Sequence, residues 1–219
     1  MLSTIPNLAT EVLEKGFVIF RKFSVNPQNS TDTTFTGYKT SPVFTGTDSS
    51  INFSYNVPYL TVVASFFHTH PPKGYAAQSA IDIYNLIEST IGEPHTVGNF
   101  VAAADGSQYG ITITDPSLAF AFLGTKSQFL DGTKWNTESD IGKAFDKAKI
   151  YFERLYKGNP NQTNLAYEMA MAAVLNQFNT GITLNKKDGS HFRPIIVKTT
   201  HDPQKPKKII YLQECISND

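Results

Sequence analysis

The residues best suited to chemistry lie between positions 68 and 82, where the chain reads HTHPP, a short loop and then SAID. Side chains two positions apart on a strand point to the same face, so His68 and His70 would present two imidazoles side by side. Asp82 would add a carboxylate from the first turn of the next helix. Two imidazoles and one carboxylate are a typical ligand set for a catalytic zinc ion that keeps a position for water. The spacing therefore predicts a Zn²⁺ site formed by His68, His70 and Asp82.

Such a site would suit the hydrolysis of an amide bond. Bound zinc lowers the pKa of its water to about 7, which makes a nucleophile available at neutral pH. A nearby carboxylate would take the proton and deliver it to the leaving amine. The hydroxyl of Ser79 would stabilise the oxyanion that forms. Together these groups predict a metallohydrolase.

The elements around this segment must place the imidazole pair at the rim of a sheet. The run LTVVASFF (60–67) is continuously β-branched and aromatic, which predicts a central strand covered on both faces. The double proline after His70 cannot continue a ladder. Apolar residues at helical spacing then predict a helix that starts near Ser79 and ends at Gly92.

The remaining pattern predicts an α+β fold, with a mixed central β-sheet flanked by helices and a C-terminal helical pair and β-hairpin. We expect one domain over 1–132 and an extension over 133–219, with the alternative that the extension packs on the same core. A polar stretch at 132–140 marks the proposed boundary. The other expected elements are a short helix at 6–13, strands at 16–25 and 51–57, a hairpin at 99–114, helices at 116–129, 141–155 and 165–178, and strands at 192–200 and 207–215.

Composition excludes several classes of protein. The 219 residues include 19 Lys and Arg against 19 Asp and Glu, and this balance argues against nucleic-acid binding through phosphate contacts. The one cysteine cannot form an internal disulfide or a cysteine-rich zinc site. No apolar run is long enough to span a membrane, and no signal peptide is visible. The expected location is therefore cytoplasmic by default, with a secreted effector as the alternative.

The segment HTHPPKGYAAQSAID (68–82) resembles the motif of the JAB/JAMM (MPN-type) zinc metalloproteases, in their bacterial JAB-like branch. The resemblance covers about residues 5–125 and implies a fold of the MPN, cytidine-deaminase-like type. It also implies that His68, His70 and Asp82 bind zinc and that Ser79 assists at the oxyanion. The family has a glutamate near the first strand that acts through the bound water. Glu14 is the candidate for that role, and Glu11, one helical turn earlier, is the alternative.

The function that follows is a zinc-dependent peptidase or isopeptidase that acts on a protein or peptide substrate. Two departures from the family pattern motivate an inactive binding or scaffold module as an alternative. The loop before Ser79 is one residue longer than usual, and Glu14 is one residue closer to the following glycine. A bacterial effector or toxin domain is a third hypothesis. Simpler interpretations also remain for the motif: a hydrogen-bonded structural histidine pair, and a helix-capping box made by Ser79 and Asp82.

Overall fold

The computed structural model describes residues 11–202 and 205–214. The expected helix at 6–13 lies mostly outside these ranges, and residues 11–13 form bends. In chain order the elements are β1 (Lys15–Asn26), β2 (Asn29–Thr40), β3 (Phe44–Thr45), β4 (Thr61–His70), α2 (Ala80–Gly92), β5 (Gly98–Ala103), β6 (Gln108–Ile113), α3 (Pro116–Leu123), α4 (Lys126–Phe129), β7 (Leu130–Asp131), β8 (Lys134–Trp135), α5 (Asp140–Leu155), α6 (Gln162–Gln177), β9 (Ile182–Asp188), β10 (His191–Pro194), β11 (Ile196–Asp202) and β12 (Lys205–Glu214).

A mixed sheet forms the centre of the molecule and confirms the expected α+β class. Its strand order is β10-β9-β6-β5-β4-β1-β2, and β3 also pairs with β1. Strands β4 and β5 run parallel and are connected through α2, whereas the other neighbouring pairs in this sheet are antiparallel. Strand β4 is central, as its apolar sequence predicts, and it extends through His70 before Pro71 ends it.

The end of β1 closely approaches the end of β4. Gly16 pairs with His68, and a Cβ atom at Gly16 would lie 2.5 Å from the carbonyl oxygen of Phe67. The backbone N–H of Lys15 donates to the Thr69 hydroxyl at 2.9 Å. Glycine is therefore required at position 16, and its presence brings the residues just before β1 beside the histidine pair.

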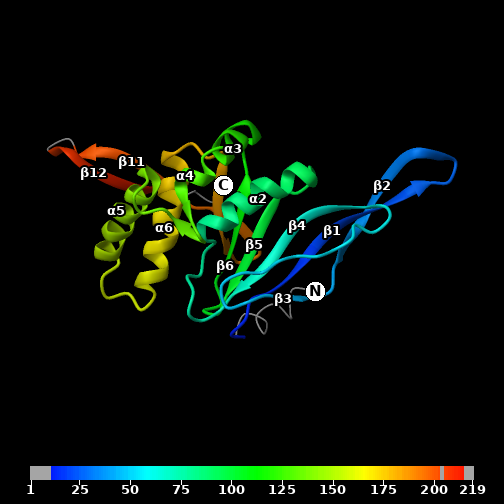
Figure 1. Cartoon of the computed structure of the whole chain (residues 1–219), viewed down its shortest axis with the longest axis horizontal. Helices are drawn as coiled ribbons and strands as arrows, with labels where there is room; N and C mark the ends of the chain where they lie inside the picture. Colours follow the sequence, from blue (N-terminus) through cyan, green and yellow to red (C-terminus); the bar gives the residue numbers. More distant parts are fainter. Residues whose placement is uncertain (1–10, 203–204, 215–219) are drawn as a thin grey trace.

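The hairpin of β1 and β2 projects from the body as a long arm, shown in blue in Figure 1. The strand expected at 51–57 does not form. Its alternation nevertheless has a structural basis, because Phe53 and Tyr55 pack against the buried cluster of β1 and β4 while their neighbours are exposed. Side-chain burial, rather than a backbone ladder, explains the period-two pattern in this segment.

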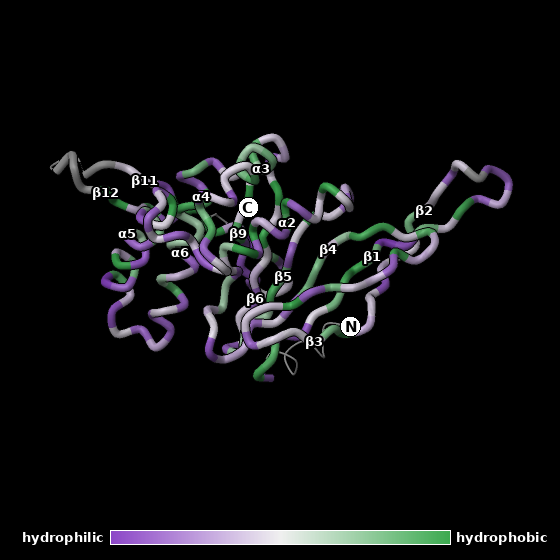
Figure 2. The backbone as a smooth tube through the Cα atoms, viewed as in Figure 1, coloured by the Kyte–Doolittle hydropathy of each residue, from purple (hydrophilic) through white to green (hydrophobic). Residues whose placement is uncertain are grey.

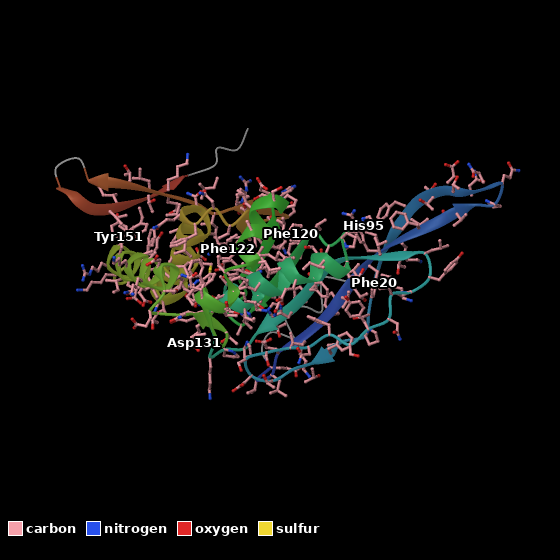
Figure 3. All side chains as sticks on the ribbon, turned by 45° about the horizontal axis from the view of Figure 1, so that its top comes forward. Phe20, His95, Phe120, Phe122, Asp131 and Tyr151 are labelled. Atoms are coloured by element: carbon pink, nitrogen blue, oxygen red, sulfur yellow. The ribbon has the colours of Figure 1, made fainter. Side chains whose placement is uncertain are left out.

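The helices lie on either side of the proposed boundary but share one buried core. Tyr84 of α2, Phe122 of α3 and Trp135 of β8 form aromatic contacts, with ring centroids 5.2–6.3 Å apart. Helices α5 and α6 contribute residues to the same cluster. Figure 3 shows Phe122 among the crowded side chains of the body. It also shows Tyr151 on α5, near the hairpin of β11 and β12. The division at residue 132 therefore remains a prediction, and the two sides are packed together.

Three details of the C-terminal half differ from the sequence-based prediction. The helix expected at 116–129 is two helices, because the chain breaks at Gly124 and Thr125. Strand β9 was not expected, and it pairs with β6 to extend the main sheet. The strand expected at 192–200 is divided after Pro194, with β10 on the main sheet and β11 paired with β12. Figure 2 shows hydrophobic residues along the central strands and hydrophilic ones in the α5–α6 connection.

Candidate metal centre

Three side chains meet where β4 ends and α2 begins. The Nε2 atoms of His68 and His70 are 3.1 Å apart. The carboxylate oxygens of Asp82 lie 3.6 Å from His68 Nε2 and 3.8 Å from His70 Nε2. Ligands that share one tetrahedral zinc ion at bond lengths of about 2.0–2.1 Å are separated by roughly 3.3 Å. Small movements of these side chains would therefore bring all three onto one ion, and the donor set fits zinc.

The backbone and a neighbouring strand orient the two imidazoles. The Nδ1–H of His70 donates to the carbonyl oxygen of Tyr75 at 2.7 Å, which leaves its Nε2 facing the site. In the described part of the chain, neither Nδ1 of His68 nor Oδ1 of Asn99 has a hydrogen-bond partner. The Asn99 side chain of β5 is close enough to raise the pKa of His68 against the effect of burial. Such outer contacts fix the tautomer of a ligating histidine.

The two oxygens of Asp82 have different surroundings. Oδ2 accepts hydrogen bonds from the backbone N–H of Ser79 at 2.8 Å and from its hydroxyl at 2.6 Å. Oδ1 is the atom nearest His68. The carboxylate therefore caps the first turn of α2 with one oxygen and faces the imidazoles with the other. Capping and metal binding, which compete in the sequence pattern, are compatible in this geometry.

The protonation states suit cation binding. Complete burial lowers the pKa of His68 to about 4, against the opposing effect of Asp82, so this imidazole is neutral at pH 7. Burial would raise the pKa of Asp82, but the nearby imidazoles and the Ser79 hydrogen bonds outweigh it and the pKa falls below its usual value. At pH 7, where His68 carries no charge, the two Ser79 hydrogen bonds stabilise the ionised carboxylate. A neutral imidazole and an ionised carboxylate are the forms that bind a metal.

Glu14 is the glutamate that reaches the site. It is 6% exposed and borders both cavities next to the metal ligands. Its backbone is held by Thr47 and Gly46, with N···O distances of 2.7 and 2.8 Å. Burial, and then the negative charges of Asp82 and Asp48, raise its pKa to about 8. Glu11 is exposed instead and pairs with Lys15 at 3.1 Å.

Two cavities meet at this centre. The first, which we call the His70-side cavity, has a volume of about 280 Å³ and reaches towards β8 and α5. The second, the His68-side cavity, has a volume of about 600 Å³ and lies along the extended segment 49–55. Both are bordered by Glu14 and Ser79. A substrate can therefore approach the centre from two directions.

Sequence reasoning identified His68, His70, Asp82, Ser79 and Glu14, and the structure brings all five together. It missed three supporting residues. Tyr75 orients His70 through a backbone carbonyl, which no side-chain motif reveals. Gln78 donates its side-chain N–H to the Asn99 carbonyl oxygen at 3.0 Å and ties the loop to β5. Asn99 itself is a buried polar residue in an apolar strand. A polar residue in such a sequence is unusual, and this could have marked Asn99 as a candidate for the site.

The chain matches no protein-family model and no curated protein sequence. Among the described residues, no helix has the length and apolar character required to cross a membrane. His95, in the loop after α2, is exposed and is not part of the cluster of His68, His70 and Asp82.

Proposed function

We propose that the protein is a zinc-dependent hydrolase of the JAB/JAMM type that cleaves an amide bond in a protein or peptide. The observation that carries this proposal is the His68, His70 and Asp82 cluster, whose ligand atoms all lie within 4.8 Å of one another. The adjoining elements support an MPN-type fold, since a buried strand, the ligand-bearing helix and a hairpin follow one another as the resemblance implies.

The residues have separate tasks. His68, His70 and Asp82 would hold the ion, whose bound water becomes acidic enough to supply a nucleophile near neutral pH. Glu14 is placed to accept a proton at its carboxylate and return it to the departing amine nitrogen. Burial and negative neighbours raise its pKa to about 8 in the metal-free protein, where the carboxyl is mostly protonated at pH 7. The positive charge of a bound zinc ion would lower this pKa and make the carboxylate available as a proton acceptor.

The hydroxyl of Ser79 contacts one of the proposed metal ligands. Its hydroxyl donates to Oδ2 of Asp82 at 2.6 Å, so in this arrangement it positions the carboxylate. To stabilise an oxyanion, the hydroxyl would have to rotate away from Asp82 and towards the substrate. The oxyanion role therefore remains a proposal, whereas the contact with Asp82 supplies an immediate reason for a serine at this position.

A binding or scaffold module without activity is the second candidate. The observation that favours it is the aromatic surface of the projecting arm, where Phe35 and Tyr38 are 51% and 55% exposed with ring centroids 5.2 Å apart. Exposed aromatic clusters of this kind often mark contact surfaces. This candidate predicts that the protein binds a partner through the arm and cleaves nothing.

Metal analysis and peptide cleavage together test the proposed function. We expect one zinc ion per chain after purification without chelators, and its loss in His68→Ala and Asp82→Ala. His95→Ala is the matched control, because His95 is exposed and outside the ligand cluster, and it should keep its zinc. Glu14→Gln should retain zinc but lose hydrolysis of a mixed peptide library. A wild-type protein that takes up no zinc, even after loading, would refute the metal site.

A further inference from the structure

The His70-side cavity is a pocket that begins at the candidate metal centre and ends in the C-terminal half of the chain. At one end it is bordered by Glu14, His70 and Ser79, so its contents lie beside the reacting groups. At the other end it is bordered by Trp135 and Phe145. Its volume of about 280 Å³ is near the lower limit of small-molecule pockets. This space suits one side chain, not a folded domain.

The walls of the cavity are aromatic. Trp135, Phe145 and Tyr167 are buried and come from β8, α5 and α6, and Tyr75 stacks on Tyr167 with ring centroids 4.0 Å apart. The lining also includes small residues, among them Ala77 and Ala80. Aromatic rings with small residues in the same lining favour a bulky apolar occupant, because contact with the rings removes its surface from water.

Charged residues of both signs border the cavity, and Lys149 lies beside its aromatic wall. The Lys149 ammonium group lies 5.3 Å from the centre of the Tyr75 ring, and the same ring stacks on Tyr167. The Tyr75 ring therefore already contacts both Tyr167 and Lys149. An incoming cation would be repelled by the positive charge of Lys149. At the exposed border, Lys134 stands against Asp48 and Asp146, so the charges there do not select an acidic group.

We propose that the His70-side cavity is a specificity site that binds one large apolar or aromatic side chain of the substrate, adjacent to the bond that is cleaved. The role of this cavity in catalysis rests on the proposed hydrolase function. Binding in the cavity can nevertheless be measured without any turnover, because Trp135 is the one tryptophan of the chain and borders the cavity.

The first experiment titrates the zinc-loaded protein with capped amino-acid amides and follows Trp135 fluorescence. N-acetylphenylalanine amide should give a saturable change. N-acetylglycine amide and N-acetyllysine amide should bind at least about tenfold more weakly, which is the lower end of what burial of an aromatic side chain contributes. Equal responses to the phenylalanine, glycine and lysine compounds would overturn the inference.

A pair of glycine substitutions localises the binding. Gly74 borders the cavity, and a Cβ atom there would meet nothing closer than the Pro71 carbonyl oxygen at 3.6 Å. A Cβ atom is therefore tolerated at position 74, and the ring of Gly74→Phe at the border of the cavity should abolish the response to the phenylalanine amide. Gly92→Phe is the matched control, because a Cβ atom there meets nothing within 4 Å and Gly92 borders none of the described cavities. Undiminished binding in Gly74→Phe would contradict the assignment.

Peptide cleavage separates this inference from the proposed function. In a peptide series that varies one residue at a time beside the cleaved bond, one position should prefer Phe or Leu over Gly by about tenfold or more in kcat/KM. Gly74→Phe should remove this preference while its zinc content stays unchanged. Selective binding without hydrolysis would support the cavity and refute the hydrolase. Hydrolysis without any apolar preference would support the hydrolase and refute the cavity.

Discussion

The unusual titration of Glu14 predicts a pH-dependent loss of stability in the metal-free protein. Burial, followed by the charges of Asp82 and Asp48, raises the pKa of this carboxyl from 4.5 to about 8. The folded state therefore prefers the protonated form. The stability associated with that preference is fully present below pH 4.5 and is lost as the pH rises towards 8. Glu14→Gln cannot ionise and should escape this loss.

The size of the effect follows from the same pKa interval. Each pH unit between the unfolded and folded pKa values corresponds to about 1.4 kcal/mol, so the upper limit is roughly 5 kcal/mol. Glu14 borders two cavities that open towards solvent, and water there screens the carboxylate. We therefore expect about 2 kcal/mol.

The assay is urea unfolding of the wild type and Glu14→Gln, both stripped of metal, between pH 4.5 and pH 8. The free energy of unfolding of the variant minus that of the wild type should increase by about 2 kcal/mol across this range. Glu11→Gln is the control, because Glu11 is exposed, and its difference from the wild type should stay nearly constant. A constant difference for Glu14→Gln as well would refute the buried, proton-retaining state of this carboxyl.

Substitutions at two further positions test the support of the site and of the core. Asn99→Leu removes the oxygen that faces His68 and should weaken zinc binding about 10–100-fold in a chelator competition, whereas Asn99→Asp, which keeps an oxygen there, should bind more tightly than the leucine variant. Tyr109→Phe removes the hydroxyl that donates to buried Glu168, leaving Lys186 as its ion-pair partner at 2.8 Å. This variant should lose about 1–3 kcal/mol in the free energy of unfolding without a change in zinc content, and equal stability would contradict the role of the hydroxyl.

The candidate site was predictable because its parts are local. His68 and His70 depend on the period of one strand, and Asp82 depends on the start of the next helix. Those rules act within a few residues and hold once β4 and α2 form. Glu14 was harder, since no local rule places it beside the histidines. Its position depends on the pairing of Gly16 with His68, which joins segments 52 residues apart in sequence.

The errors in the fold have a common physical cause: pairing between distant segments has no local signal. Strand β9 has the sequence ITLNKKD, whose polar half resembles a loop, yet it lies in the sheet between β6 and β10. The segment 51–57 shows the opposite case, since its alternation resembles a strand but its aromatic side chains pack without a ladder. Tertiary contacts decide which strands pair and in which register. The hydrophobic period of a single segment carries no information about those contacts.

The residues proposed for chemistry and those proposed for selectivity come from different parts of the sequence. All three proposed metal ligands belong to one contiguous segment, 68–82, and the proposed base lies just before the neighbouring strand. The outer wall of the His70-side cavity comes instead from β8, α5 and α6. Changes in that C-terminal wall would therefore reshape the space for the substrate while leaving the ligand atoms in place. Selectivity can vary independently of metal binding because the two depend on different parts of the sequence.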